Sequence, residues 1–207
     1  MRSVFQYLGE VMVATQYWPS TVQKYSKNIV NTFIDVTKSV INHFKPTPTK
    51  AHYTFSWRDL VKVFLSAQMV EGNSLKGQEN VIKLVYHECL RTYGDRLLID
   101  LDREWFLKNL EEICRQHFNI IGEDGSNPNS HEQELGRGKT KTKKCKWPIA
   151  DPERLFLSHW NKEAEGFYME VDKVDDIKSV IEGNLERYND SNERIHIDLM
   201  LYNQLNR

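Results

Sequence analysis

Apolar side chains recur every three or four positions along most of the chain, the spacing of one face of an α-helix. The first such stretch covers residues 3–15, and a longer one begins at Ser20, the expected N-cap, and ends before Pro46. The apolar stripe of this longer helix consists of Val22, Tyr25, Ile29, Phe33, Val36, Val40 and Phe44.

Three further helices are predicted between residues 56 and 118. The first follows Ser56, which forms a variant capping box with Asp59 three positions later. The second covers residues 78–93 and ends at Gly94, and the third is capped by Asp102. The predicted inward positions are Leu60, Val63, Phe64 and Ala67 in the first helix, Val81, Leu84, Val85, Cys89 and Leu90 in the second, and Trp105, Phe106, Leu110, Ile113 and Phe118 in the third.

The pattern breaks at residues 122–146, which contain almost no apolar side chain and predict a long disordered loop. Helical spacing returns at residues 172–188, with Val174, Ile177, Val180, Ile181, Leu185 and Tyr188 expected to face inward. The last apolar segment, residues 195–205, fits either a strand or a helix, and we favour a helix. The predicted fold class is therefore all-α.

Composition narrows the range of functions. The chain has 207 residues, a formal net charge of −1 and 40% hydrophobic residues, so it is an ordinary globular chain without the charge of a polyanion binder. Its odd number of cysteines suits a reducing compartment. We find neither a signal peptide nor a membrane span, so a cytoplasmic location is expected, with no membrane and no nucleic acid as partner. The basic run at residues 137–146 is interpreted as a solvated loop; contact with nucleic acid, an acidic protein surface or lipid headgroups is the less favoured alternative.

Motifs for metal or phosphate chemistry are weak. Cys114 and His117 have the spacing of zinc ligands, and Cys145 follows, but no fourth ligand is evident and no metal site is predicted. The tripeptide from His87 to Cys89 is interpreted as structural, because adjacent residues on a helix point to different faces. There is no GxxxxGK[ST] sequence, so no phosphate-cradling loop is predicted.

Arg58 is the strongest functional candidate. It lies in the first turn of a helix, where the macrodipole disfavours a cation. One interpretation is a surface arginine whose stem packs on Trp57 or Phe55. The other is that its guanidinium faces a phosphate, together with the open amides of the first helical turn.

The segment PTPTKAHYTFSWRDLVKVF (residues 46–64) resembles the start of the helical lid of the third AAA+ module in dynein heavy chains, especially axonemal ones. The resemblance covers most of the chain apart from residues 122–146. It continues through residues 86–106 and through FYMEVDKVDDIKSVIEGNLERYN, which resembles the family's stretch towards the fourth module. The matching residues in the first two segments are His52, Tyr53, Phe55, Arg58, Asp59, Leu60, Lys62, His87, Glu88, Arg91, Asp95, Arg96, Leu97, Asp102, Trp105 and Phe106.

The resemblance implies a division of the chain and a role for Arg58. Residues 1–45 correspond to helices from the end of an AAA+ large subdomain, 46–121 to the lid, 122–148 to a polar, basic loop, and 149–207 to remaining lid helices and the linker towards the next module. Arg58 matches the sensor II arginine, which approaches the γ-phosphate of the nucleotide. Ser56, Trp57 and Asp59 support it, although the family usually has Asn-Leu where this chain has Ser56 and Trp57.

The implied function is that of a non-catalytic lid fragment supporting nucleotide-dependent regulation of microtubule-based movement. Without Walker motifs the fragment is not expected to hydrolyse ATP or to hold a cofactor by itself; ATP or ADP with Mg²⁺ belongs to the complete module. The implied partners are neighbouring AAA+ modules of the same heavy chain and, indirectly, dynein light and intermediate chains and microtubules, in the cytoskeleton of the ciliary axoneme. The alternative is a stand-alone helical protein-interaction module. The lid interpretation predicts exposed apolar faces, because the neighbouring modules are absent.

Overall fold

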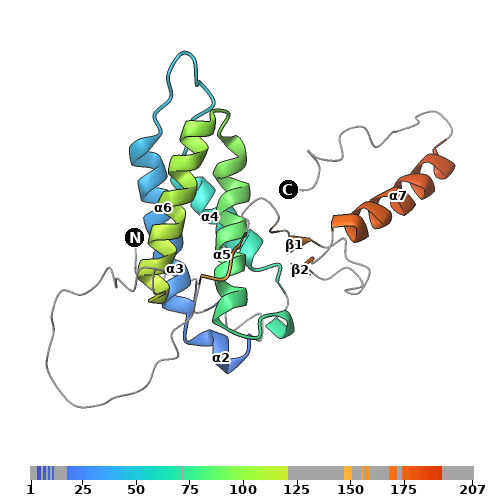
Figure 1. Cartoon of the computed structure of the whole chain (residues 1–207), viewed down its shortest axis with the longest axis horizontal. Helices are drawn as coiled ribbons and strands as arrows, with labels where there is room; N and C mark the ends of the chain where they lie inside the picture. The colour runs from blue at the N-terminus through green and yellow to red at the C-terminus, as the bar shows by residue number, and fades with distance from the viewer. Residues whose placement is uncertain are drawn as a thin grey trace, which may run out of the picture.

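In the computed structural model of the chain, the described regular secondary structure is almost wholly helical (Figure 1). It describes residues 4, 5, 7, 9, 11, 18–70, 72–120, 147–150, 155, 157–158, 168–171 and 174–192. The described residues between 4 and 11 are helical, and the elements that follow are α2 (Ser20–Gln23), α3 (Ser26–His43), α4 (Trp57–Ala67), η1 (Gly72–Ser74), α5 (Gln78–Thr92), η2 (Gly94–Arg96), α6 (Asp100–Phe118), β1 (Leu157–Ser158), β2 (Met169–Glu170) and α7 (Val174–Ser191). The two-residue strands pair in antiparallel fashion. The all-α prediction is thus confirmed, with this one short strand pair as an addition within the described part of the chain.

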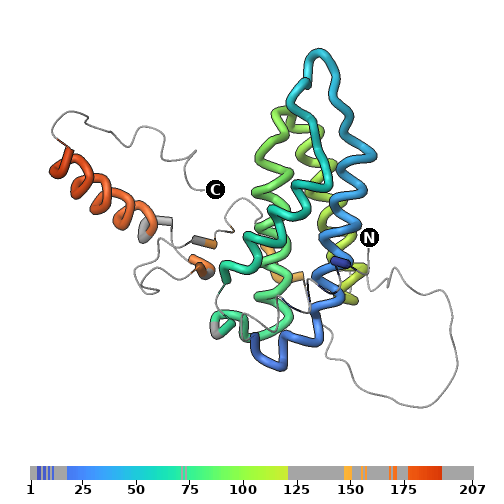
Figure 2. Tube along the Cα trace, turned by 180° about the vertical axis from the view of Figure 1, so that it is seen from behind, coloured from blue at the N-terminus to red at the C-terminus, as the bar shows by residue number. Residues whose placement is uncertain are grey.

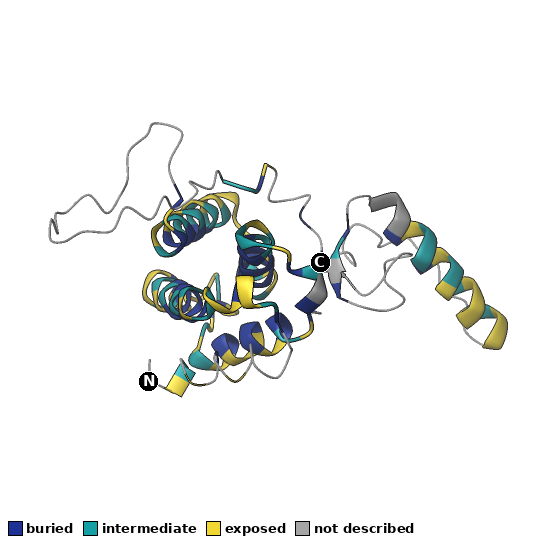
Figure 3. Ribbon diagram, turned by 90° about the horizontal axis from the view of Figure 1, so that it is seen from below, coloured by how far each residue is buried: buried dark blue, intermediate teal, exposed yellow. Residues whose placement is uncertain are grey.

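Helices α3, α4, α5 and α6 form one bundle, and their buried residues face its interior (Figures 2 and 3). The predicted apolar stripes supply this core, and its fully buried large side chains include Phe33, Leu60, Leu84, Phe106 and Leu110. Each such side chain contributes roughly 1.5–3 kcal/mol through removal from water. Among the described residues, no helix has the length and apolar character needed to cross a membrane.

The helix predicted to begin at Ser20 is divided in two. Pro19 is the N-cap of α2, and α3 begins only at Ser26, after a turn at Lys24 and Tyr25. Tertiary contacts of Tyr25 account for the break: its ring packs 6.1 Å from that of Phe118, and its hydroxyl donates to Gln78 Oε1 at 3.1 Å. The prediction of Ser20 as the N-cap was wrong, because proline at the preceding position already fixes the entry into the helix.

The predicted start of α6 and the predicted role of Gly94 after α5 also differ from the structure. Helix α6 begins at Asp100, two residues before Asp102, and its N-cap is Ile99. The Asp102 carboxylate instead accepts hydrogen bonds from Lys50 Nζ at 2.6 Å and from the Tyr53 hydroxyl at 2.8 Å. Gly94 follows α5 as predicted, but it opens η2 rather than forming a left-handed cap.

Helix α7 projects away from the bundle in all three views (Figures 1 to 3). Ile177 and Ile181 are buried together with Val171 in a small second cluster. The inward prediction for Tyr188 was wrong, since this side chain is 43% exposed. The predictions for the loop at residues 122–146 and for the helix at residues 195–205 lie outside the described residues.

Candidate functional site

The site is built on the extended segment that joins α3 to α4. Aromatic rings fix this segment to the end of the bundle: Phe44 lies 5.5 Å from Tyr53 and 5.8 Å from Phe55, measured between ring centroids. Tyr53 is buried, and its hydroxyl reaches Asp102 on α6. The start of α4 is therefore held by packing on both sides rather than left as a free loop.

A capping box begins α4, as the sequence predicted. Ser56 is the N-cap with extended backbone angles, and its backbone N–H donates to Asp59 Oδ2 at 2.9 Å. Ser56 and Asp59 thereby satisfy amides that the first helical turn leaves open. Asp59 is 4% exposed, so its carboxylate is part of the protein interior rather than a surface charge.

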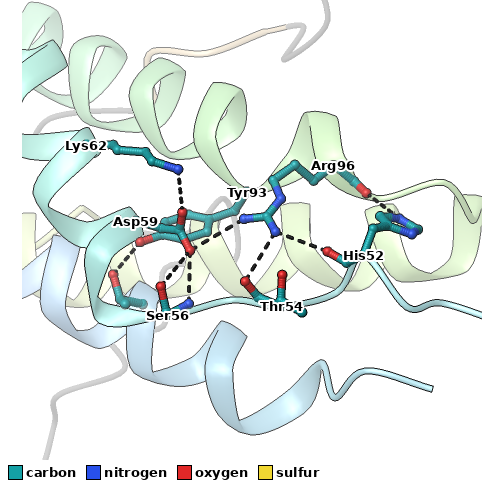
Figure 4. A network of polar contacts seen from close by, with 8 residues as sticks. His52, Thr54, Ser56, Asp59, Lys62, Tyr93 and Arg96 are labelled. Atoms are coloured by element: carbon teal, nitrogen blue, oxygen red, sulfur yellow. Dashed lines mark hydrogen bonds and ion pairs between the residues drawn. The ribbon is translucent and has the colours of Figure 1, made fainter. Parts of the chain in front are cut away.

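Arg96 holds the same segment from η2 (Figure 4). Its guanidinium donates to the backbone carbonyls of His52 at 3.1 Å and Thr54 at 3.3 Å, and lies 3.4 Å from Asp59 Oδ2. It also lies over the ring of Phe55, 4.4 Å from the centroid. One arginine thus fixes the strand-like approach to α4 through three kinds of contact.

The charges around Asp59 stabilise its ionised form. Burial alone would raise the pKa of Asp59, but hydrogen bonds from Lys62 Nζ and the Ser56 N–H, with the charges of Lys62 and Arg96, lower the pKa below its ordinary value. The Lys62 Nζ to Asp59 Oδ1 distance is 3.0 Å. At neutral pH this cluster therefore contains one carboxylate and two cations.

Arg58 lies directly beside this cluster but takes no part in it. Its side chain is exposed, and it forms no hydrogen bond or ion pair with any residue that the structure describes. The guanidinium that covers Phe55 is that of Arg96. Helical spacing places Arg58 on the same outer face of α4 as Val61 and Leu65, which are 44% and 56% exposed.

A second polar cluster is centred on α5. Glu88 on α5 is fully buried, and Arg91 donates to its Oε2 from Nη2 at 3.0 Å and from Nε at 3.3 Å. The structural interpretation of the tripeptide holds for His87, whose Nδ1 donates to the Leu155 carbonyl at 3.1 Å. Sequence spacing showed that Glu88 and Arg91 share a helix, but it gave no sign of their partners elsewhere in the chain.

The alternative metal site has no support in the described residues. Cys114 is buried in the bundle, and His117 Nε2 lies 3.0 Å from Asp35 Oδ2 on α3. No group of three potential metal-binding side chains occurs in the part of the chain that the structure describes. Cys145, the third residue of that set, lies outside the described residues.

Comparison with known families agrees with this geometry. Residues 7–103 match the family model of the dynein heavy chain ATPase lid domain, which spans the capped helix α4 together with α3 and α5. This part of the chain belongs to that family. The match to the lid model begins at residue 7. The sequence analysis assigned residues 1–45 to the large subdomain and began the lid at residue 46, and this boundary stays a prediction.

The relatives are axonemal and ciliary dynein heavy chains. The chain is 25% identical to human dynein axonemal heavy chain 12 in an alignment of 209 positions, which covers 98% of this chain and 6% of the relative. It is 28% identical to the ciliary dynein beta chain of Tripneustes gratilla over 92% of its own length and 4% of the relative's. It is 33% identical to the ciliary dynein beta chain of Heliocidaris crassispina over 69% of its own length and 3% of the relative's. The chain thus spans only a small part of the relatives that it matches.

Proposed function

We propose that this chain acts as the non-catalytic lid of the third AAA+ module of an axonemal dynein heavy chain, and that Arg58 serves as its sensor II arginine. The observation that carries the proposal is the contrast between Arg58 and its surroundings. Every charged neighbour in the Asp59 cluster is paired, whereas Arg58 is exposed and has no partner among the described residues.

Electrostatics favours an anion at this position. A cation in the first turn of a helix is disfavoured by about 0.3–1 kcal/mol through the macrodipole. A phosphate group would reverse this effect, because it interacts favourably with the guanidinium and with those first-turn amides that the capping box does not use. The γ-phosphate of a nucleotide would form this interaction before hydrolysis, and the interaction would be lost afterwards. This difference in interaction energy between the two nucleotide states could shift the position of the lid.

The nucleotide itself would be held by other parts of the complete module. In this proposal ATP or ADP with Mg²⁺ occupies that module, and the chain contributes only the sensing arginine. Neighbouring AAA+ modules are its direct partners, with light chains, intermediate chains and microtubules acting at a distance. The names of the relatives support a location in the cytoskeleton of the ciliary axoneme.

An exposed apolar stripe supports the lid over the stand-alone interaction module. Val61, Leu65 and Met69 recur every four positions on and just after α4, and they are 44%, 56% and 56% exposed. Together with Arg58 they form a face with a cation at one end and apolar surface along the rest. Such a face suits a helix that closes over a nucleotide and rests on a neighbouring subdomain.

The test compares Arg58→Ala with Arg58→Lys in a complete heavy chain, with Arg187→Ala on α7 as the control for loss of an exposed arginine. We expect Arg58→Ala to weaken nucleotide-dependent regulation of microtubule release and Arg58→Lys to restore it in part. In the 207-residue chain, Arg58→Ala is expected to leave the free energy of unfolding unaltered or to raise it by at most about 1 kcal/mol, because it removes a cation that the macrodipole disfavours. Unchanged nucleotide affinity and unchanged release would count against the sensor role, and unfolding of the short chain would show that Arg58 is structural.

A further inference from the structure

Glu88 is a fully buried carboxylate whose two oxygens bind different parts of the chain. Its Oε2 accepts hydrogen bonds from Arg91 on the same helix, and its Oε1 accepts one from the Tyr168 hydroxyl at 2.5 Å. A buried carboxylate is costly unless charged and hydrogen-bonding partners surround it. Tyr168 lies 80 positions further along the chain, so this one side chain joins two distant segments.

Further contacts extend from Arg91 towards α4 and from α5 towards the segment that contains Tyr168. Towards α4, Arg91 Nη2 donates to Ser66 Oγ at 2.5 Å, in the last turn of that helix. Towards the later segment, Lys83 Nζ lies 2.5 Å from Glu170 Oε1, and the backbone of Tyr168 forms a parallel bridge with Val70 just after α4. Residues 168–170 are thus attached both to α5 and to the end of α4.

The same segment is the attachment of α7. Val171 packs with Ile177 and Ile181 of α7 in the second hydrophobic cluster, while α7 itself projects away from the bundle. A series of direct contacts therefore runs from Ser66 through Arg91 and Glu88 to Tyr168, and the backbone then leads through Val171 into α7.

We propose that Glu88 is a positioning residue that couples α4 to residues 168–171, so that α7 moves together with the helix that carries Arg58. The coupling follows from burial, because separation of residues 168–171 from α5 would leave one oxygen of Glu88 without its partner. The buried network is therefore stable when complete and costly when partly opened. The mechanical coupling stands without any nucleotide; only its link to Arg58 rests on the proposed function.

The test measures the relation of α4 to α7 in the 207-residue chain. Spin labels are placed at two exposed positions, through Leu65→Cys on α4 and Tyr188→Cys on α7, in a Cys145→Ser background. The native Cys89 and Cys114 are fully buried, so they are not expected to react with the label. The readouts are the label-to-label distance distribution from pulsed electron spin resonance and hydrogen exchange of residues 168–171.

Two variants perturb the coupling, and a third is the control. Tyr168→Phe removes only the hydroxyl that binds Glu88, and Glu88→Gln removes the charge. Tyr93→Phe removes an equally buried hydroxyl, which bonds Thr37 on α3 and lies outside the network. All three keep the ring or the length of the side chain, so cavity formation is not expected to contribute.

We expect Tyr168→Phe and Glu88→Gln to broaden the distance distribution and to accelerate exchange of residues 168–171 about tenfold or more, the factor for one lost hydrogen bond to a charged group. Tyr93→Phe should change neither readout. An unchanged distribution and unchanged exchange in Tyr168→Phe would overturn the proposal, as would equal changes in the Tyr93→Phe control. Because no nucleotide is present, the result is independent of whether Arg58 is a sensor.

Discussion

Replacement of Asp59 by alanine tests how the start of α4 is held. The carboxylate is almost fully buried and has three roles: it completes the capping box with Ser56, and it pairs with Lys62 and with Arg96. Alanine keeps the helix propensity but removes all three contacts at once. The expected effect is a moderate loss of stability with the hydrophobic core intact.

The magnitude can be worked out contact by contact. Loss of a capping interaction costs about 1 kcal/mol, within a range of roughly 0.5–2. The Lys62 side chain is 61% exposed, so its ion pair contributes little, on the order of 0–0.5 kcal/mol. Arg96 is 31% exposed and loses a charged partner at 3.4 Å, for which about 0.5–1 kcal/mol is reasonable. With about 1 kcal/mol for the cap, the sum is about 1.5–2.5 kcal/mol.

The assay is urea-induced unfolding of the 207-residue chain, followed by tryptophan fluorescence and circular dichroism. Asp59→Asn is expected to fall between wild type and Asp59→Ala, because the amide oxygen still accepts from the Ser56 N–H while the charge is lost. Asp100→Ala in the first turn of α6 is the matched control, since Asp100 is exposed and should cost at most about 0.5 kcal/mol. An Asp59→Ala effect no larger than that of the control would refute the reasoning.

Three further outcomes are expected from the same unfolding assay. Phe106→Ala should destabilise by about 3–5 kcal/mol, because the ring is fully buried; an effect under about 1 would contradict its place in the core. Gly94→Ala should cost about 1–3 kcal/mol, because the new Cβ would lie 2.6 Å from Leu90 Cδ1, and a neutral result would show that Leu90 yields easily. The pKa of His87 lies below its ordinary value, because the effect of burial exceeds the opposing effects of the Glu88 charge and the Leu155 hydrogen bond. Below a pH of about 6.5 the unfolded chain therefore binds more protons than the folded chain, and stability should fall as the pH drops. His87→Asn should remove this slope; an unaltered slope would assign it to another group.

The local features of the fold were predictable from the sequence. The capping box of α4 follows from residue types three positions apart, and the apolar stripes follow from helical periodicity, so both depend on neighbours in the chain. The position of Arg58 in the first turn of α4 is equally local. Whether it meets a phosphate is a property of chain segments beyond the described bundle, and it stays a prediction.

Two of the errors share one cause, which is contact between distant segments. The break before α3 depends on Tyr25 meeting Phe118 and Gln78, and the role of Asp102 depends on Lys50 and Tyr53. These partners lie about fifty or more positions apart in sequence. Periodicity contains no information on which polar side chains will meet across the bundle, because many pairings satisfy the same apolar pattern.

Helix α4 is fixed at both ends and open along its outer face, and this combination bears on what it does. Asp59 and Arg96 hold its first turn, and Arg91 holds its last turn through Ser66. A helix that served only the core would not need its exposed side to be placed so firmly, since packing of the inner face already contributes most of the stability. A helix that must present an arginine to a phosphate does need it, because small displacements of a charged group weaken its interaction steeply. The two polar clusters therefore favour a helix whose outer face contacts another surface.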